Sequence, residues 1–118
     1  MKTQQTTLIP LDPKIEARIG LSIETLAEFC RKWGIDSMAL FGSVLREDFR
    51  PDSDLDFLVT FSSDTRQGLL KQVKIKHDLE SFVSRKVDIV VRQSVEESDN
   101  WIRRREILTT ERIIYEQR

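Results

Sequence analysis

Two aspartates at the start of an apolar run are the residues of this chain best suited to chemistry. Asp54 and Asp56 open residues 54–61, a run whose composition predicts a strand. Side chains two positions apart on a strand point to the same face, with their Cα atoms about 7 Å apart. Both carboxylates can therefore reach one divalent cation or a pair of them. Because unpaired carboxylates are costly to bury, we expect a cation beside them.

A candidate phosphate-binding turn precedes this pair. Residues 37–41 are too short for a helix and lie between Gly34 and Gly42, which predicts an earlier strand. Gly42 and Ser43 follow it, and residues 44–48 are predicted to open a short helix. A glycine allows a ligand to approach the backbone, and free N–H groups at a helix start suit a phosphate. An ordinary turn between a strand and a helix is the alternative interpretation.

A third carboxylate, Asp88, interrupts the apolar residues 87–91, which predict a third strand. If this strand lies about 4.8 Å beside the second, Asp88 joins the first two aspartates on one face. The alternative is an aspartate at a strand edge, paired with Arg85 or Lys86. Because the other two carboxylates are present, we favour the cluster.

Helices must cover the sheet that holds these strands. Apolar residues recur at helical spacing over residues 13–33, after Asp12 as the N-cap, and Gly20 is a point at which this helix can divide. The other predicted elements are a helix from about residue 64 to residue 84, a helix over residues 94–110 and a strand over residues 113–115. Together they predict an α+β (α/β) fold, a small mixed β-sheet with helices packed on one face.

The length of 118 residues, with 39% hydrophobic residues, suits one small core. Residues 1–10 are polar and are predicted to be a flexible tail, which leaves residues 11–118 as a single domain. Cys30 and His77 are the only residues of their types. We expect Cys30 to be buried and inert, His77 to face solvent, and both tryptophans, Trp33 and Trp101, to be buried or half-buried.

The charges are nearly balanced, because 19 basic and 20 acidic residues give a formal net charge of -1. No overall field therefore favours nucleic acid or an anionic membrane, and Arg103, Arg104 and Arg105 predict a solvated helix face. No run approaches the ~18 apolar residues that a membrane span needs. A single cysteine cannot form an internal disulfide, so we expect a cytoplasmic protein.

Taken together, these motifs resemble the nucleotidyltransferase signature of the DNA polymerase β superfamily. The resemblance lies in Gly42-Ser43, a gap of ten residues, Asp54-x-Asp56 and the later Asp88. More narrowly, the chain resembles the minimal MNT-type nucleotidyltransferases, the antitoxin partners of HEPN-domain toxins, in its blocks GSVLR, PDSDLDFLV, RKVDIVV and RIIYE. The match extends from about Leu21 to Tyr115 and implies a nucleotidyltransferase (polymerase β-like) fold.

The resemblance also implies roles for the site residues. Gly42 and Ser43 would hold the β- and γ-phosphates of ATP, and Asp54 and Asp56 would bind Mg²⁺. Asp88 would bind a second Mg²⁺ or deprotonate the attacking hydroxyl. Two such ions about 3.5–4 Å apart stabilise the charge that grows on the attacking and leaving oxygens.

Two further residues match the family pattern as nucleotide-binding candidates. Arg46 matches the arginine after the Gly-Ser pair, which orients the triphosphate or braces the loop. A salt bridge to Glu47, Asp48 or Asp52 is the alternative for Arg46. Ser53 matches the serine before the aspartate pair, where its hydroxyl steadies the turn or touches a phosphate.

The phosphate loop departs from the family pattern at two positions. Leu45 replaces the usual small residue, and Glu47 replaces the usual glycine. A bulkier and acidic loop can narrow the triphosphate site or repel phosphate. Neither departure removes a metal ligand, so we still expect activity.

For the narrower family, the implied reaction is transfer of AMP from ATP to a tyrosine hydroxyl of a cognate HEPN ribonuclease toxin, with release of pyrophosphate. The expected partners are this toxin, in a hetero-oligomer, and ATP with Mg²⁺, without direct nucleic-acid or membrane binding. One alternative is a non-catalytic antitoxin that neutralises the toxin by binding. The other is a nucleotidyltransferase acting on a small-molecule hydroxyl.

Overall fold

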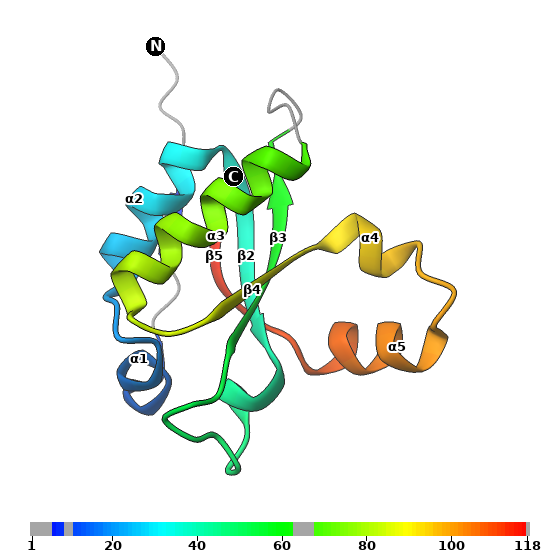
Figure 1. Cartoon of the computed structure of the whole chain (residues 1–118), viewed down its shortest axis with the longest axis horizontal. Coiled ribbons are helices and arrows are strands. Elements are labelled where there is room, and N and C mark those ends of the chain that lie inside the picture. The colour runs from blue at the N-terminus through cyan, green and yellow to red at the C-terminus, as the bar shows by residue number, and fades with distance from the viewer. Residues whose placement is uncertain (1–5, 9–10, 63–67, 118) are drawn as a thin grey trace.

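A mixed five-stranded sheet forms the centre of the protein, as shown in a computed structural model that describes residues 6–8, 11–62 and 68–117 (Figure 1). The strand order is β1-β5-β2-β3-β4. Strands β3 and β4 are parallel, and the other neighbouring pairs are antiparallel. The strands are β1 (Thr6–Leu8), β2 (Ile35–Phe41), β3 (Leu55–Phe61), β4 (Val87–Val91) and β5 (Arg112–Gln117). The predicted mixed sheet is confirmed.

The helices connect these strands and lie in part where the spacing of apolar residues predicted them. They are α1 (Pro13–Ile19), α2 (Ile23–Trp33), the 3₁₀ turn η1 (Gly42–Leu45), α3 (Leu69–Val83), α4 (Arg92–Glu96) and α5 (Trp101–Thr110). The Asp12 carboxylate accepts a hydrogen bond from the Lys14 N–H at 2.8 Å and caps α1. Gly20, in the left-handed region at φ 81°, ends this helix and divides it from α2. The start predicted near residue 64 for the helix that the structure shows as α3 lies outside the described residues.

The alternation of side chains along the strands gives the sheet two apolar faces. Met38 and Leu40 of β2 belong to the main core, which α2 and α3 complete. Ala39 and Phe41 lie on the second face, in a smaller cluster with Val95 of α4 and Ile107 of α5. Helices therefore pack on both faces, whereas the sequence predicted one. Figure 1 shows α4 and α5 on the opposite side of the strands from α1, α2 and α3.

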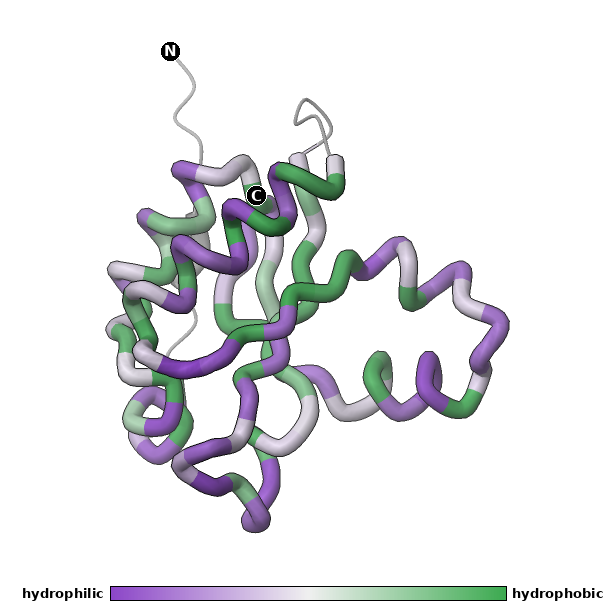
Figure 2. Tube along the Cα trace, viewed as in Figure 1, coloured by the Kyte–Doolittle hydropathy of each residue, from purple (hydrophilic) through white to green (hydrophobic). Residues whose placement is uncertain are grey.

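The helix predicted over residues 94–110 is two helices. The side chain of Asn100 accepts a hydrogen bond from the Arg103 N–H at 3.1 Å and starts α5 after a break. Trp101 is 58% exposed, so the prediction that it is at least half-buried is wrong. It lies six positions before the buried Ile107 and thus on another side of the helix. Figure 2 shows that the hydropathy of α5 is mixed, whereas the end of β4 is continuously hydrophobic.

The predicted flexible tail is wrong for residues 6–8, because they form β1 and pair with β5 at the edge of the sheet. Residues 1–5 and 9–10 lie outside the described residues. Strand β5 contains the predicted strand over residues 113–115 and lies between β1 and β2. In the ranges that the structure describes, no helix is long and apolar enough to cross a membrane.

Candidate active site

The structure brings the three predicted aspartates to one region of the second face. Asp56 and Asp88 are direct register partners across the parallel pairing of β3 and β4. Asp54 comes two residues before Asp56 and is exposed, as is Asp88, whereas Asp56 is half-buried. Among the described residues, Asp88 forms no ion pair with Arg85 or Lys86, which was the alternative.

The electrostatics of Asp56 reflect this clustering. Burial of the carboxyl, followed by the charges of Asp88 and Asp54, raises the pKa of Asp56 to about 6. Arg46 and Arg103 act in the opposite direction and lower this pKa. Since two like charges oppose its ionisation, the site carries a negative charge that a bound cation would offset.

Gly42 connects the phosphate loop to the carboxylates. It follows Phe41, the register partner of Asp56, and adopts φ +81°. A Cβ atom at position 42 would lie 2.3 Å from Oδ2 of Asp56, which is far inside van der Waals contact. Only glycine therefore fits here. The predicted helix at residues 44–48 is instead the 3₁₀ turn η1, which contains Gly42 and the half-buried Ser43.

A pocket of about 480 Å³ opens beside this turn. Its walls come from η1, from one side of α5 and from the start of β5, with Gly42 in the first wall. Asp56 does not itself line the pocket, but Gly42, which does, lies against the Asp56 carboxylate. The lining residues of the pocket are Phe41, Gly42, Leu45, Arg46, Arg103, Glu106, Ile107, Thr110 and Arg112. Sequence reasoning missed Arg103 and Arg112, and the helical spacing of Arg103, Ile107 and Thr110 was the one available signal.

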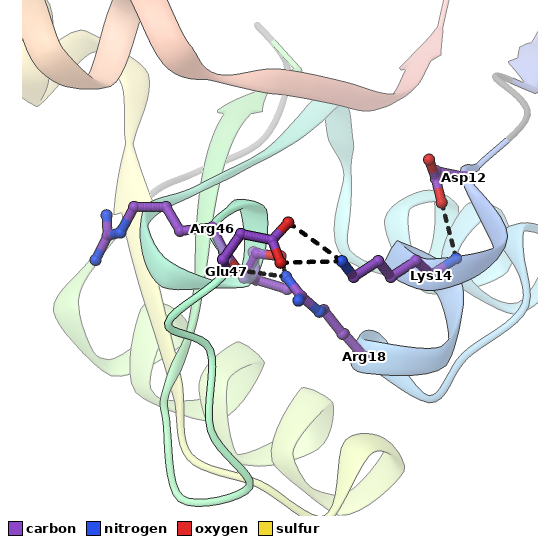
Figure 3. Close-up of polar contacts among 6 residues, drawn as sticks. Asp12, Lys14, Arg18, Arg46 and Glu47 are labelled. Carbon is purple, nitrogen blue, oxygen red and sulfur yellow. Dashed lines mark hydrogen bonds and ion pairs between the residues drawn. The ribbon is translucent and has the colours of Figure 1, made fainter.

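The charged residues of the phosphate loop extend in different directions (Figure 3). Arg46 lines the pocket and also pairs with Asp48, with 3.1 Å between Nε and Oδ1. The salt bridge offered as an alternative for Arg46 is thus present. Glu47 pairs instead with Lys14 of α1 at 3.3 Å and does not line the pocket. Its charge is therefore directed away from the proposed phosphate site, while the bulk of Leu45 remains in the pocket wall.

An arginine from α1 holds the end of the phosphate turn. Arg18 Nη1 donates hydrogen bonds to the carbonyl oxygen of Val44 at 2.8 Å and to that of Arg46 at 2.7 Å. Figure 3 shows this side chain reaching the loop beside Lys14. Charge-assisted bonds to two nearby carbonyls fix the backbone path out of the turn.

A second arginine holds the other end of the same loop. Arg85 Nη1 donates to the carbonyls of Arg50 at 2.9 Å and Ser53 at 2.8 Å. The Ser53 hydroxyl accepts a hydrogen bond from the Arg50 N–H at 2.9 Å, a contact that fits the turn-steadying role of the two considered for Ser53. The Phe49 ring lies 5.1 Å from the Arg18 guanidinium and 4.6 Å from that of Arg85. The loop joining the Gly-Ser turn to the aspartates is therefore braced at both ends.

The donor set suits magnesium in its chemistry. Asp54, Asp56 and Asp88 offer only oxygen atoms, which Mg²⁺ prefers, and their mutual repulsion favours a cation. Among the described residues, however, no group of three or more His, Cys, Asp or Glu side chains is close enough to form a complete metal site. The three carboxylates thus supply ligands of a suitable kind without forming a three-ligand cluster in the described residues.

Two other reactive side chains lie elsewhere. Cys30 is fully buried, as predicted, and burial raises the pKa of its thiol far above the ordinary value. His77 is exposed and 3.8 Å from Glu80, as expected for a solvent-facing residue. Neither residue lines the pocket.

These features match a known family. The model of the family described as nucleotidyltransferase domain matches residues 23–115 of the chain. The match covers most of the chain, so this protein belongs to the nucleotidyltransferase domain family, as its Gly-Ser and Asp-x-Asp motifs predicted.

More specific similarities point to minimal members of this class. The protein adenylyltransferase MntA of Thermococcus cleftensis is 32% identical over 68 residues, which are 58% of this chain and 67% of that protein. A solved structure described as that of a minimal nucleotidyltransferase is 31% identical with a TM-score of 0.58, covering 75% of this chain and 85% of its own. A chain in the complex of tri-AMPylated Shewanella oneidensis HEPN toxin with MNT antitoxin is 16% identical with a TM-score of 0.55. The match covers 79% of this chain and 68% of that chain. This last likeness shows the fold alone.

Proposed function

We propose that this protein is an antitoxin that transfers AMP from ATP to a tyrosine hydroxyl of a cognate HEPN ribonuclease toxin. The observation that carries the proposal is the close approach of the Asp56 carboxylate to Gly42, a residue of the pocket lining, which leaves no room for a Cβ atom between them. Nucleotide transfer needs this juxtaposition, because the α-phosphorus must lie beside the acidic groups while the rest of the triphosphate occupies the cavity.

The toxin partner and the AMP group are supported by similarity. The Thermococcus cleftensis relative is named a protein adenylyltransferase, and a complex with the same fold contains an AMPylated HEPN toxin beside an MNT antitoxin. We extend both features to this chain and expect a hetero-oligomer with its toxin. AMP on the toxin would silence its ribonuclease.

In the proposed reaction, the tyrosine oxygen attacks the α-phosphorus of ATP. A new oxygen–phosphorus bond forms, the bond from the α-phosphorus to the bridging oxygen breaks, and pyrophosphate leaves. The backbone at Gly42 and Ser43 binds the β- and γ-phosphates, and the exposed Asp88 accepts the tyrosine proton. Asp54, Asp56 and Asp88 would hold Mg²⁺, which when bound offsets the charge on the attacking and leaving oxygens.

A second candidate is an antitoxin that acts by binding alone. It is favoured by one observation, that no three acidic or other ligand side chains in the described residues converge into a complete metal site. This form of the protein would occlude the ribonuclease without modifying it. It predicts that ATP and the three aspartates are dispensable for inhibition.

Intact-mass spectrometry of the toxin separates the two candidates. After incubation with this protein, ATP and Mg²⁺, the toxin should gain the mass of one or more AMP units. The gain should be lost with Asp54→Ala, Asp56→Ala and Asp88→Ala, and kept with Asp52→Ala, an exposed aspartate of the same loop. Unmodified toxin that is inhibited equally by wild type and by all four variants would refute catalysis and leave binding.

A further inference from the structure

The pocket has a cationic wall that lies outside the family motifs. Arg103 projects from α5 and Arg112 begins β5, and both line the cavity that Gly42 and Arg46 border from the other side. Glu106 is the one acidic residue among the lining residues. Three arginines and one glutamate leave two net positive charges on the lining, although the whole chain has a formal net charge of -1.

Among the described residues, the guanidinium groups of Arg103 and Arg112 are not paired directly, although the positive charge of Arg103 lowers the pKa of Asp56. Within the described residues, neither side chain forms a hydrogen bond or an ion pair, and only the backbone N–H of Arg103 is engaged, by Asn100. Two other arginines of this region do have partners, since Arg92 pairs with Glu111 and Arg104 donates to the Ser98 carbonyl at 2.7 Å. An arginine fork without a partner, facing a cavity, is suited to the oxygens of a phosphate.

The position of this wall is fixed by packing. Ile107 is 4% exposed and belongs to the second-face cluster with Ala39 and Phe41. Arg103 lies one helical turn before Ile107, and Thr110 lies about one turn after it, so all three are on one side of α5. The packing of Ile107 that anchors α5 therefore also presents Arg103 to the pocket. The cavity volume of about 480 Å³ lies within the range typical of sites for small molecules.

We propose that Arg103 and Arg112 bind the outer phosphate groups, β and γ, of the nucleoside triphosphate from the α5 and β5 side of the pocket, opposite Gly42. This inference rests on the proposed function and adds two binding residues to those of the motifs. Their charge would neutralise the triphosphate and the pyrophosphate that departs from it. Arginine binds phosphate through two parallel N–H donors, which gives orientation as well as affinity.

The test is calorimetric binding of ATP with Mg²⁺ to wild type, Arg103→Ala, Arg112→Ala and a matched control, Arg105→Ala. Arg105 lies on the same helix, is exposed and does not line the pocket. Loss of a charged hydrogen-bonding partner should weaken ATP binding by roughly 10- to 100-fold in each pocket variant. The control should stay within about twofold of wild type, and Arg103→Lys should recover part of the loss because it restores the charge.

Binding of AMP distinguishes phosphate recognition from damage to the fold. If the two arginines bind the outer phosphates, the loss on substitution should be much smaller for AMP than for ATP. The inference would be overturned if the substitutions weakened AMP binding and ATP binding equally. It would also be overturned if Arg103→Ala and Arg112→Ala bound ATP as tightly as Arg105→Ala does. Either result would leave the proposal of AMP transfer intact. Failure of the wild-type protein to bind ATP would instead overturn the proposed function, and this inference with it.

Discussion

Replacing Asp56 by asparagine should stabilise the folded protein at neutral pH while abolishing AMP transfer. Burial and the charges of Asp88 and Asp54 raise the pKa of Asp56 to about 6, from an ordinary value of about 3.9. Below the ordinary value the carboxyl is neutral in both folded and unfolded chains. Above pH 6 it is ionised in both, and the folded chain alone carries the cost of burial and repulsion. The stability of the wild type should therefore fall as the pH rises from about 4 to 6.

The size of this effect follows from the shift. One pKa unit corresponds to about 1.4 kcal/mol, so two units set an upper limit of about 3 kcal/mol. Because Asp56 is half-buried and partly screened by solvent, we expect about 1 kcal/mol. Asparagine keeps the shape of the side chain and removes the charge. It also removes a proposed metal ligand, which is why activity should be lost as stability rises.

Urea unfolding at pH 4 and pH 8, with a chelator present, measures this prediction. At pH 8 the midpoint of Asp56→Asn should exceed that of wild type by roughly 0.3–1 M urea, and at pH 4 the two should nearly coincide. Asp52→Asn, an exposed aspartate of the preceding loop, should match wild type at both pH values. A variant no more stable than wild type at pH 8, or a gain of equal size at both pH values, would refute the reasoning.

Three further predictions follow from individual contacts. Gly42→Ala should lower AMP transfer by at least about tenfold and destabilise the fold by roughly 1–3 kcal/mol, because the new Cβ atom would meet Asp56. Gly20 is the control, because it has the same φ and nothing lies within 4 Å of where its Cβ would be. Gly20→Ala should therefore show only the effect of backbone strain in the same assays. Arg18→Ala should release the phosphate loop, which would be measured as faster limited proteolysis and a lower transfer rate. Lys14→Ala removes only an exposed ion pair and should change stability by less than about 0.5 kcal/mol. Equal effects of the two substitutions would contradict the bracing role of Arg18. Cys30 should react with a thiol reagent only after unfolding, since burial raises its pKa, and modification of the native protein would contradict this.

The part of the site that follows local rules was predictable from the sequence. Alternation along a strand predicts Asp54 and Asp56 on one face, although Asp54 lies one residue before β3, and the apolar residues around Asp88 predict a neighbouring strand. The structure has that neighbour in parallel register. Gly42 was predictable as a special position because it directly follows a strand, although its contact with Asp56 depends on the pairing of β2 with β3.

The features that depend on distant partners were not predictable. The cationic wall exists because Arg103 on α5 and Arg112 on β5 line the same cavity, and each is an ordinary surface residue in its local sequence. Strand β1 is a polar segment that joins the sheet through its backbone, so its hydropathy gives no signal. The exposed Trp101 shows the same limit, since residue type predicts burial on average and the packing of α5 decides it here.

The most direct test of AMP transfer uses ATP labelled at different phosphates. This protein, the proposed HEPN toxin partner and Mg²⁺ would be incubated with ATP carrying radioactive phosphorus at either the α or the γ position, and the toxin would then be isolated. The proposed mechanism predicts label on the toxin from the α position only, lost with Asp56→Asn and with a toxin whose acceptor tyrosine is phenylalanine. Label from the γ position would show phosphoryl transfer instead, and a toxin that is inhibited without label from either position would contradict catalysis altogether.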